Sequence, residues 1–107
     1  MKPLVRHERA DEDVREAIQY LLENAPASAL NFVDVLEQTF LQVQRHPSIG
    51  SPRYAHELNL PDLRFWPCKH FPYLVFYVES AHQIDVWRIL HSSRDIPQWL
   101  QPNESEY

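Results

Sequence analysis

The chain has 107 residues, a formal net charge of −5 and a single cysteine, Cys68. This length predicts one domain that buries roughly two thirds of its unfolded surface, and a hydrophobic fraction of 44% argues against disorder. One cysteine excludes an internal disulfide, and the absence of a signal pattern or a long apolar run favours a cytoplasmic protein. The acidic balance argues against nucleic acid as the main partner.

The first predicted elements are a short strand and a helix. Residues 2–7 (KPLVRH) have an apolar centre between charged flanks, which favours a strand at a sheet edge. Residues 8–24 predict a helix, because their apolar side chains recur at three- and four-residue spacing. Acids crowd its first turns, where the helix dipole favours them. We interpret this acidic run as a solvated helix start, and the alternative is a patch that binds a partner.

A second helix follows the break at residues 24–26. Pro26 suits a first helical turn, and Pro47 disfavours helical geometry in the residue before it, so this helix is predicted to run from Pro26 to His46. The short connection predicts an antiparallel hairpin of the two helices. A stripe of apolar side chains at helical spacing is typical of a surface that faces the core. Its members are Ala29, Phe32, Val33, Leu36, Phe40 and Val43.

A connector and an edge strand come next. Residues 47–62 predict a turn-rich connector, in which Gly50, the only glycine, is expected to take a positive φ. Residues 63–69 predict a strand that is either at a sheet edge or bulged, since Pro67 cannot donate to a β-ladder. Alternation along this strand puts Arg64 and Trp66 on one face.

Residues 71–78 and 83–91 predict the two central strands, joined by a turn at 79–82. Both faces of the first strand are apolar, which is typical of a covered strand. The hydroxyls of Tyr73 and Tyr77 are expected to reach the surface, and the alternative is that they point into a groove. The second strand carries Arg88, and a buried guanidinium needs a carboxylate or carbonyl partner unless it lines an open groove. Strict alternation gives one face of this strand Ile84, Val86, Arg88 and Leu90.

The predicted fold class is α+β. An N-terminal strand and an antiparallel two-helix hairpin are expected to pack on one face of a mostly antiparallel sheet of about four strands, in two layers. Residues 1–107 are expected to form a single domain. Within it, residues 96–107 predict an irregular arm that is ordered near Trp99 and frayed after Pro102.

The residues that could carry chemistry are cationic and aromatic. The histidines have no ligand spacing with Cys68, so neither a metal site nor a cofactor is expected. Metal-free RNA cleavage needs a base for the 2′-hydroxyl and cations for the phosphate, which neighbouring strands could supply. The alternative is a polar edge, held by an Arg94–Asp95 or Arg88–carboxylate network, or a surface that binds protein. The set is Arg64, Lys69, Tyr73, Tyr77, Arg88, His91 and Arg94.

Several segments, in this order, resemble one known family over most of the chain. They are Ala10-Asp11 before a helix with Ile18 and Tyr20, a second helix with Ala29, Phe32 and Leu36, the turn 46–53 (HPSIGSPR), Leu63-Arg64, Phe71-Pro72-Tyr73, Phe76-Tyr77, residues 84–89, and residues 90–95 (LHSSRD). In this order they are similar to the ParE branch of the RelE/ParE toxin superfamily of bacterial type II toxin–antitoxin systems. The family fold matches the one predicted from the residues.

This resemblance implies a small cytoplasmic toxin that is held in a hetero-oligomer by a co-expressed antitoxin. ParE-like toxins are associated with inhibition of DNA gyrase, and the RelE-like branch with ribosome-dependent mRNA cleavage. Because Lys69 is the only lysine after Lys2, the basic cluster is thin, and gyrase is the favoured target. The alternatives are a RelE-like endoribonuclease and a non-toxic binding protein with the same fold.

The resemblance also suggests which residues serve which role. The acidic charge of the chain indicates that apolar contacts hold the antitoxin complex more than charge does. Neither a membrane nor nucleic acid is expected as a direct partner. Candidates for contact with the target are Arg53, Arg64, Arg88, His91, Arg94, Asp95 and Trp99. Candidates for contact with the antitoxin are Tyr20, Trp66, Phe71, Tyr73 and Tyr77. If the protein cleaved RNA, the catalytic candidates would be Arg64, Arg88, His91 and Arg94.

Overall fold

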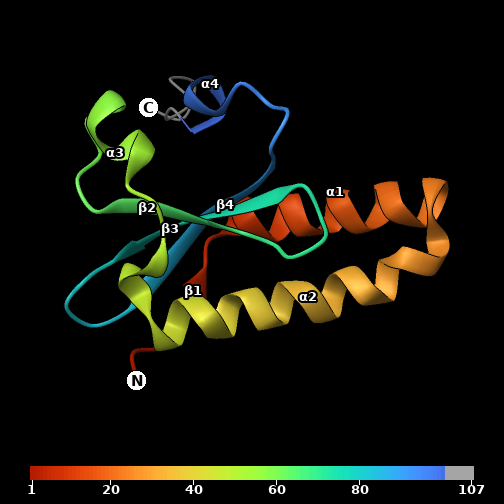
Figure 1. Cartoon of the computed structure of the whole chain (residues 1–107), viewed down its shortest axis with the longest axis horizontal. Coiled ribbons are helices and arrows are strands. Elements are labelled where there is room, and N and C mark those ends of the chain that lie inside the picture. Colours follow the sequence, from red (N-terminus) through yellow and green to blue (C-terminus); the bar gives the residue numbers. More distant parts are fainter. Residues whose placement is uncertain (101–107) are drawn as a thin grey trace.

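A four-stranded mixed sheet forms the centre of the computed structural model, which describes residues 1–100 (Figure 1). The strand order is β1-β4-β3-β2; β1 runs parallel to β4, and the other neighbours are antiparallel. The predicted edge strands, β1 and β2, do lie at the edges. The strands are β1 (Leu4–Arg6), β2 (Leu63–Pro67), β3 (Tyr73–Glu79) and β4 (Ile84–His91).

Two long helices, α1 (Glu8–Asn24) and α2 (Pro26–Arg45), form the predicted hairpin. Pro26 stands in the first turn of α2, and α2 ends directly before His46. The side chain of Asn24 donates to the carbonyl of Tyr20 at 2.9 Å, which satisfies one of the orphan carbonyls at the end of α1. Figure 1 shows the hairpin turn projecting beyond the sheet, and exposed apolar side chains, such as Leu30, lie near this turn.

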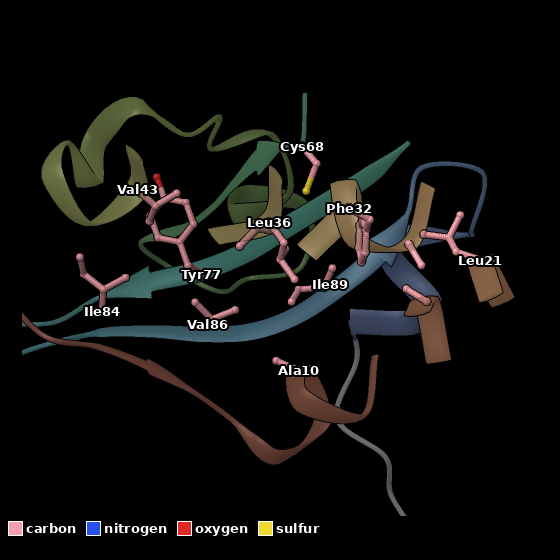
Figure 2. Close-up of a cluster of buried hydrophobic side chains, with 13 residues drawn as sticks. Ala10, Leu21, Phe32, Leu36, Val43, Cys68, Tyr77, Ile84, Val86 and Ile89 are labelled. Carbon is pink, nitrogen blue, oxygen red and sulfur yellow. The ribbon is translucent and has the colours of Figure 1, made fainter. Parts of the chain in front are cut away.

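The helix hairpin buries its apolar stripe on one face of the sheet. Phe32 and Leu36 of α2 join Val86 and Ile89 of β4 in one core cluster, which Figure 2 shows in close-up. Phe32 has no exposed surface, and burying a phenylalanine side chain stabilises the fold by about 1.5–3 kcal/mol. The predicted core face of α2 is therefore confirmed at the buried positions of the stripe.

Two short helices that the sequence did not predict, α3 (Arg53–Glu57) and α4 (Ile96–Leu100), cover the opposite face. The connector also forms η1 (Pro47–Ile49), which follows α2 and accepts a hydrogen bond from the Tyr77 hydroxyl at Pro47. A second core cluster joins α4 to β2, β3 and β4, with α3 residues packed beside it. The prediction of two layers is thus wrong at this face, because elements of three to five residues show no periodicity. Residues 101–107 of the arm lie outside the described residues.

A β-bulge in β4 overturns the predicted alternation of that strand. Tyr77 pairs with Val86 and Phe76 pairs with Arg88, so Trp87 is an extra residue without a cross-strand partner. Val86 and Ile89 consequently face the helix hairpin although they are three positions apart. Arg88 pairs across from Phe76, whose side chain belongs to the cluster on the α4 side.

Gly50 does not take the expected positive φ, because its φ is −71°. The positive φ values within residues 1–100 belong to Asn59, Asp62 and His70. A side chain at Gly50 would instead collide with the hydroxyl of Tyr77 and would lie 2.9 Å from the carbonyl oxygen of Phe65. Glycine is required here for close approach of the backbone, not for turn geometry.

Candidate functional site

A pocket of about 380 Å³ lies between α1 and the C-terminal end of β4, with α4 at one side. Its volume is near the lower limit of small-ligand pockets. Aromatic, cationic and acidic side chains line it together. The lining residues are Asp13, Glu16, Ala17, Tyr20, Tyr73, Arg88, Ile89, Leu90, His91, Ser93, Arg94 and Trp99.

A buried ion pair between Asp13 and Arg88 forms the base of the pocket. The Arg88 Nε and Nη2 atoms donate to the two carboxylate oxygens of Asp13 at 2.8 and 2.9 Å, and the exposed fractions of the two residues are 8% and 7%. The same carboxylate accepts from the backbone N–H of Ile89 at 2.9 Å. The hydrogen bonds to Asp13 raise the pKa of Arg88, so its guanidinium stays charged at any ordinary pH. The expected carboxylate partner of Arg88 is confirmed.

Two arginines hold α4 against this base. Arg88 Nη1 donates to the carbonyl oxygen of Trp99 at 2.9 Å. The guanidinium carbons of Arg94 and Arg88 lie 4.1 and 5.8 Å from the centre of the Trp99 ring, within the range of cation–π attraction. Trp99 therefore forms one wall of the pocket, while 38% of its surface stays exposed.

His91 is engaged with its own loop. The backbone N–H of Ser93 donates to Nδ1 of His91 at 3.1 Å, and the Ser93 hydroxyl lies 2.7 Å from the same atom. A nitrogen that accepts a backbone N–H carries no proton, which places the ring proton on Nε2. The ring packs edge-on against Tyr73, with centroids 5.3 Å apart. Burial, reinforced by Tyr20, raises the pKa of Tyr73, so its hydroxyl stays protonated.

The structure brings some of the predicted site residues together and separates others. Arg64 lies at the other side of the sheet on β2, where it donates to the carbonyl oxygen of Gly50 at 2.7 Å. Arg53 stacks on its neighbour Tyr54 in α3, and Asp95 accepts from the backbone N–H of Gln98 in α4. The predicted residues that line the pocket are Tyr20, Tyr73, Arg88, His91, Arg94 and Trp99.

The remaining candidates for antitoxin contact are not part of the pocket lining. Trp66 donates to the side chain of Gln42 at 3.0 Å, and Phe71 packs edge-on against Phe32. The expectation that the Tyr77 hydroxyl reaches the surface is wrong. Tyr77 has no exposed surface, and its hydroxyl donates to the carbonyl of Pro47 at 2.6 Å. It anchors the chain after α2 and has no surface for a partner.

Asp13 is the main site residue that sequence reasoning missed. Asp13 belongs to the acidic run in the first turns of the helix predicted over residues 8–24, a run that predicts exposure, and nothing in its immediate neighbours sets it apart. Its position three residues after Ala10 and four before Ala17, both on the buried face of α1, was the available signal. Combined with the need of Arg88 for a carboxylate, this position could have identified the pair.

Among the residues that the structure describes, Cys68 and the other possible metal ligands offer no alternative site. Burial raises the pKa of the Cys68 thiol, which disfavours the nucleophilic thiolate. Within residues 1–100, no group of three or more His, Cys, Asp or Glu side chains could hold a metal ion. In the same part of the chain, none of the helices has the length and apolar character needed to span a bilayer.

The fold and the pocket define a class of small α+β proteins, and comparisons with known proteins identify the family. A sequence model described as "ParE toxin of type II toxin-antitoxin system, parDE" matches residues 4–96. The chain therefore belongs to the ParE toxin family. No curated protein matches the sequence.

Solved structures support the same fold. Ten chains of solved structures match. One of them is described as "Chromosomal ParDE TA system from P. aeruginosa", with a TM-score of 0.71 and 18% sequence identity. The match covers 85% of this chain and 96% of that chain. The predicted ParE-like fold is confirmed.

Proposed function

We propose that this protein is the toxin of a type II toxin–antitoxin pair, that it inhibits DNA gyrase by binding to it, and that a co-expressed antitoxin neutralises it in the cytoplasm. Membership of the ParE toxin family supports the toxin role. The similar solved structure from P. aeruginosa is described as a ParDE TA system, and this description supports an antitoxin partner.

The dispersal of the candidate catalytic residues is the observation that favours binding over RNA cleavage. Arg64 is bonded to backbone carbonyls away from the pocket, and Arg88 is neutralised by Asp13. Of that set, the partly buried His91 and the exposed Arg94 remain. A phosphate transition state needs several convergent cations, and this arrangement does not provide them. A pocket with aromatic walls is better suited to a protein side chain.

The test is a supercoiling assay with purified protein, bacterial gyrase, relaxed plasmid and ATP. We expect supercoiling to be lost, and we expect primer extension on cellular mRNA after induced expression to show intact transcripts. Codon-periodic transcript cuts with normal supercoiling would overturn the proposal in favour of the endoribonuclease. Unchanged growth, supercoiling and transcripts would leave the non-toxic binding protein as the remaining candidate.

A further inference from the structure

The outer edge of β4 is only partly covered by β1. The parallel ladder spans Ile84 to Val86, and the backbone N–H of His7 then donates to the carbonyl oxygen of Val86 at 2.9 Å. After that point the chain turns into α1. The second half of β4 therefore continues past the end of β1, and residues 88–91 of this half line the pocket that α1 and α4 border.

The backbone groups on this part of β4 follow from the ladder with β3. The N–H of Ser92 donates to the carbonyl of Pro72, so Ser92 and, by alternation, Leu90 bond to β3. Ile89 and His91 consequently direct their backbone groups to the outer edge. The hydrogen bond from the Ile89 N–H to the Asp13 carboxylate agrees with this assignment.

Two of these four outward groups have no hydrogen-bond partner within residues 1–100. The Ile89 N–H is taken by Asp13, and the His91 carbonyl accepts from the N–H of Arg94 at 3.0 Å. The Ile89 carbonyl and the His91 N–H are left. In a parallel ladder, a single residue of an added strand would donate its N–H to the Ile89 carbonyl and accept the His91 N–H with its own carbonyl. Both residues line the pocket.

The opposite edge of the sheet is closed to such an addition. Along β2, the N–H of Leu63 donates to the carbonyl of Leu60, and Phe65 exchanges two hydrogen bonds with Ser51. Pro67 has no N–H to offer. Strand addition at the pocket is thus favoured over addition at β2.

We propose that an extended segment of the antitoxin enters this pocket and continues the line of β1, with one residue paired to the backbone of Ile89 and His91. This inference rests on the proposed function, because it names the antitoxin as the occupant. Strand addition supplies main-chain hydrogen bonds, and side-chain pockets supply the selectivity. An aliphatic or aromatic side chain of the segment packs among Tyr20, Tyr73 and Trp99.

The charges of the pocket argue for an uncharged side chain at this position. Arg88 and Asp13 neutralise each other, and the remaining charged residues of the lining, Arg94 and Glu16, have opposite signs. Occupation by the antitoxin would cover Arg94 and Trp99. Neutralisation then follows from occlusion of the surface that is proposed to contact gyrase.

A proline substitution tests the pairing directly. His91→Pro removes the outward N–H, and it leaves the β3–β4 ladder intact because that N–H is not part of it. His91→Ala loses the same side chain but keeps the N–H. The probe is the purified antitoxin encoded beside the toxin gene, and the measurement is titration calorimetry. We expect the antitoxin to bind the His91→Pro variant at least about tenfold more weakly than it binds the His91→Ala variant. A change of about tenfold is the scale of one lost hydrogen bond.

Arg6→Pro is the matched proline control. The partners of His7 and Pro3 on β4 show that the N–H of Arg6 points away from β4, toward the other side of β1. This variant should bind the antitoxin as tightly as the native protein does. Circular dichroism and thermal melts establish that each variant folds.

Each result of these binding measurements either supports or overturns the proposed backbone pairing. Equal antitoxin affinity for His91→Pro and His91→Ala overturns the pairing and leaves the proposed function standing. Absence of antitoxin binding to the native protein overturns both. If His91→Pro does not fold, hydrogen exchange on the native protein decides instead. The His91 amide should become protected at least about tenfold in the complex, and unchanged exchange overturns the pairing.

Discussion

A single carboxylate, Asp13, connects three elements of the fold. It lies on α1, accepts from the backbone of β4 at Ile89, and holds the guanidinium of Arg88, which in turn bonds to α4. Asp13→Ala would leave the buried guanidinium of Arg88 without its carboxylate and the buried N–H of Ile89 without a partner. We expect it to lower the free energy of unfolding by about 3–5 kcal/mol, measured by urea denaturation.

Two further variants separate the cost of leaving a buried charge unpaired from the cost of any substitution in this turn of α1. Replacing both partners, as Asp13→Leu with Arg88→Met, should destabilise the fold less than Asp13→Ala alone, because no uncompensated charge remains. Glu12→Gln, at an exposed acid in the same helical turn, should change stability by no more than about 0.5 kcal/mol. A loss for Glu12→Gln as large as that for Asp13→Ala would contradict the assignment.

The buried hydroxyl of Tyr77 makes stability sensitive to alkaline pH. Burial raises its pKa above the ordinary value of 10.0, so the native state keeps a proton that the unfolded chain has already lost. The stability contribution is complete below pH 10.0 and is lost as the pH rises toward the native pKa. Tyr77→Phe should lower stability by about 1–3 kcal/mol at neutral pH, because Gly50 and Pro47 lose a partner.

The measurement for Tyr77→Phe is the midpoint of urea unfolding as a function of pH. The variant should show a shallower fall above pH 10.0 than the native protein. Cys68, whose pKa burial also raises, contributes to the same alkaline fall in both proteins and serves as the common background. Parallel alkaline curves would show that the Tyr77 hydroxyl is not the group that titrates.

Arg94 is the exposed cation of the pocket, and it tests the proposed contact with gyrase. Arg94→Ala removes the charge that stacks on Trp99 without breaking a buried ion pair, so the fold should be retained. We expect inhibition of supercoiling to require about tenfold more protein, the scale of one interface residue that contributes more than about 1 kcal/mol. Arg45→Ala, an exposed arginine at the end of α2, is the control and should inhibit like the native protein.

At the scale of elements, the sequence predicts what is periodic and misses what is local. The bounds of α1 follow from apolar spacing, and those of α2 follow also from Pro26 at its start and Pro47 after its end. The bulge at Trp87 is invisible to a period-two pattern, because both possible faces of β4 carry apolar residues. Six residues of the pocket were predicted as candidates, since each stands out by charge or aromaticity. Their meeting point was not predictable, because it depends on where α1 and α4 cross the sheet.

The junction between η1 and β2 depends on the absence of a side chain at Gly50. In Gly50→Ala the new methyl group would press on the Tyr77 hydroxyl and on the backbone of β2. We expect a loss of about 1–3 kcal/mol in the free energy of unfolding, which is typical of overpacking. Ser48→Ala, at an exposed position of the same turn, should have little effect. Near-native stability of Gly50→Ala would contradict this prediction and would show that the neighbouring atoms can move to accommodate a methyl group.

At the scale of the whole molecule, the net charge of −5 shapes how partners are recognised. If apolar pocket walls and backbone pairing hold the antitoxin, its affinity should change by less than about tenfold between about 50 and about 500 mM salt, although surface charges are strongly screened over that range. Calorimetry at several salt concentrations measures this dependence. A fall in affinity of about a hundredfold would indicate that ion pairs hold the complex.

The parallel pairing of β1 with β4 has a consequence for how the protein comes into being. Leu4 meets Ile84, and Asp13 meets Arg88, so contacts between distant parts of the sequence complete the sheet. Such long-range contacts slow folding, because the intervening chain loses conformational entropy on closing into a loop before the stabilising contacts can form. A nascent chain that has not reached β4 lacks both the ladder and the pocket. If the pocket carries the activity, toxicity arises only after β4 and α4 have been synthesised, and chains that end before β4 are harmless.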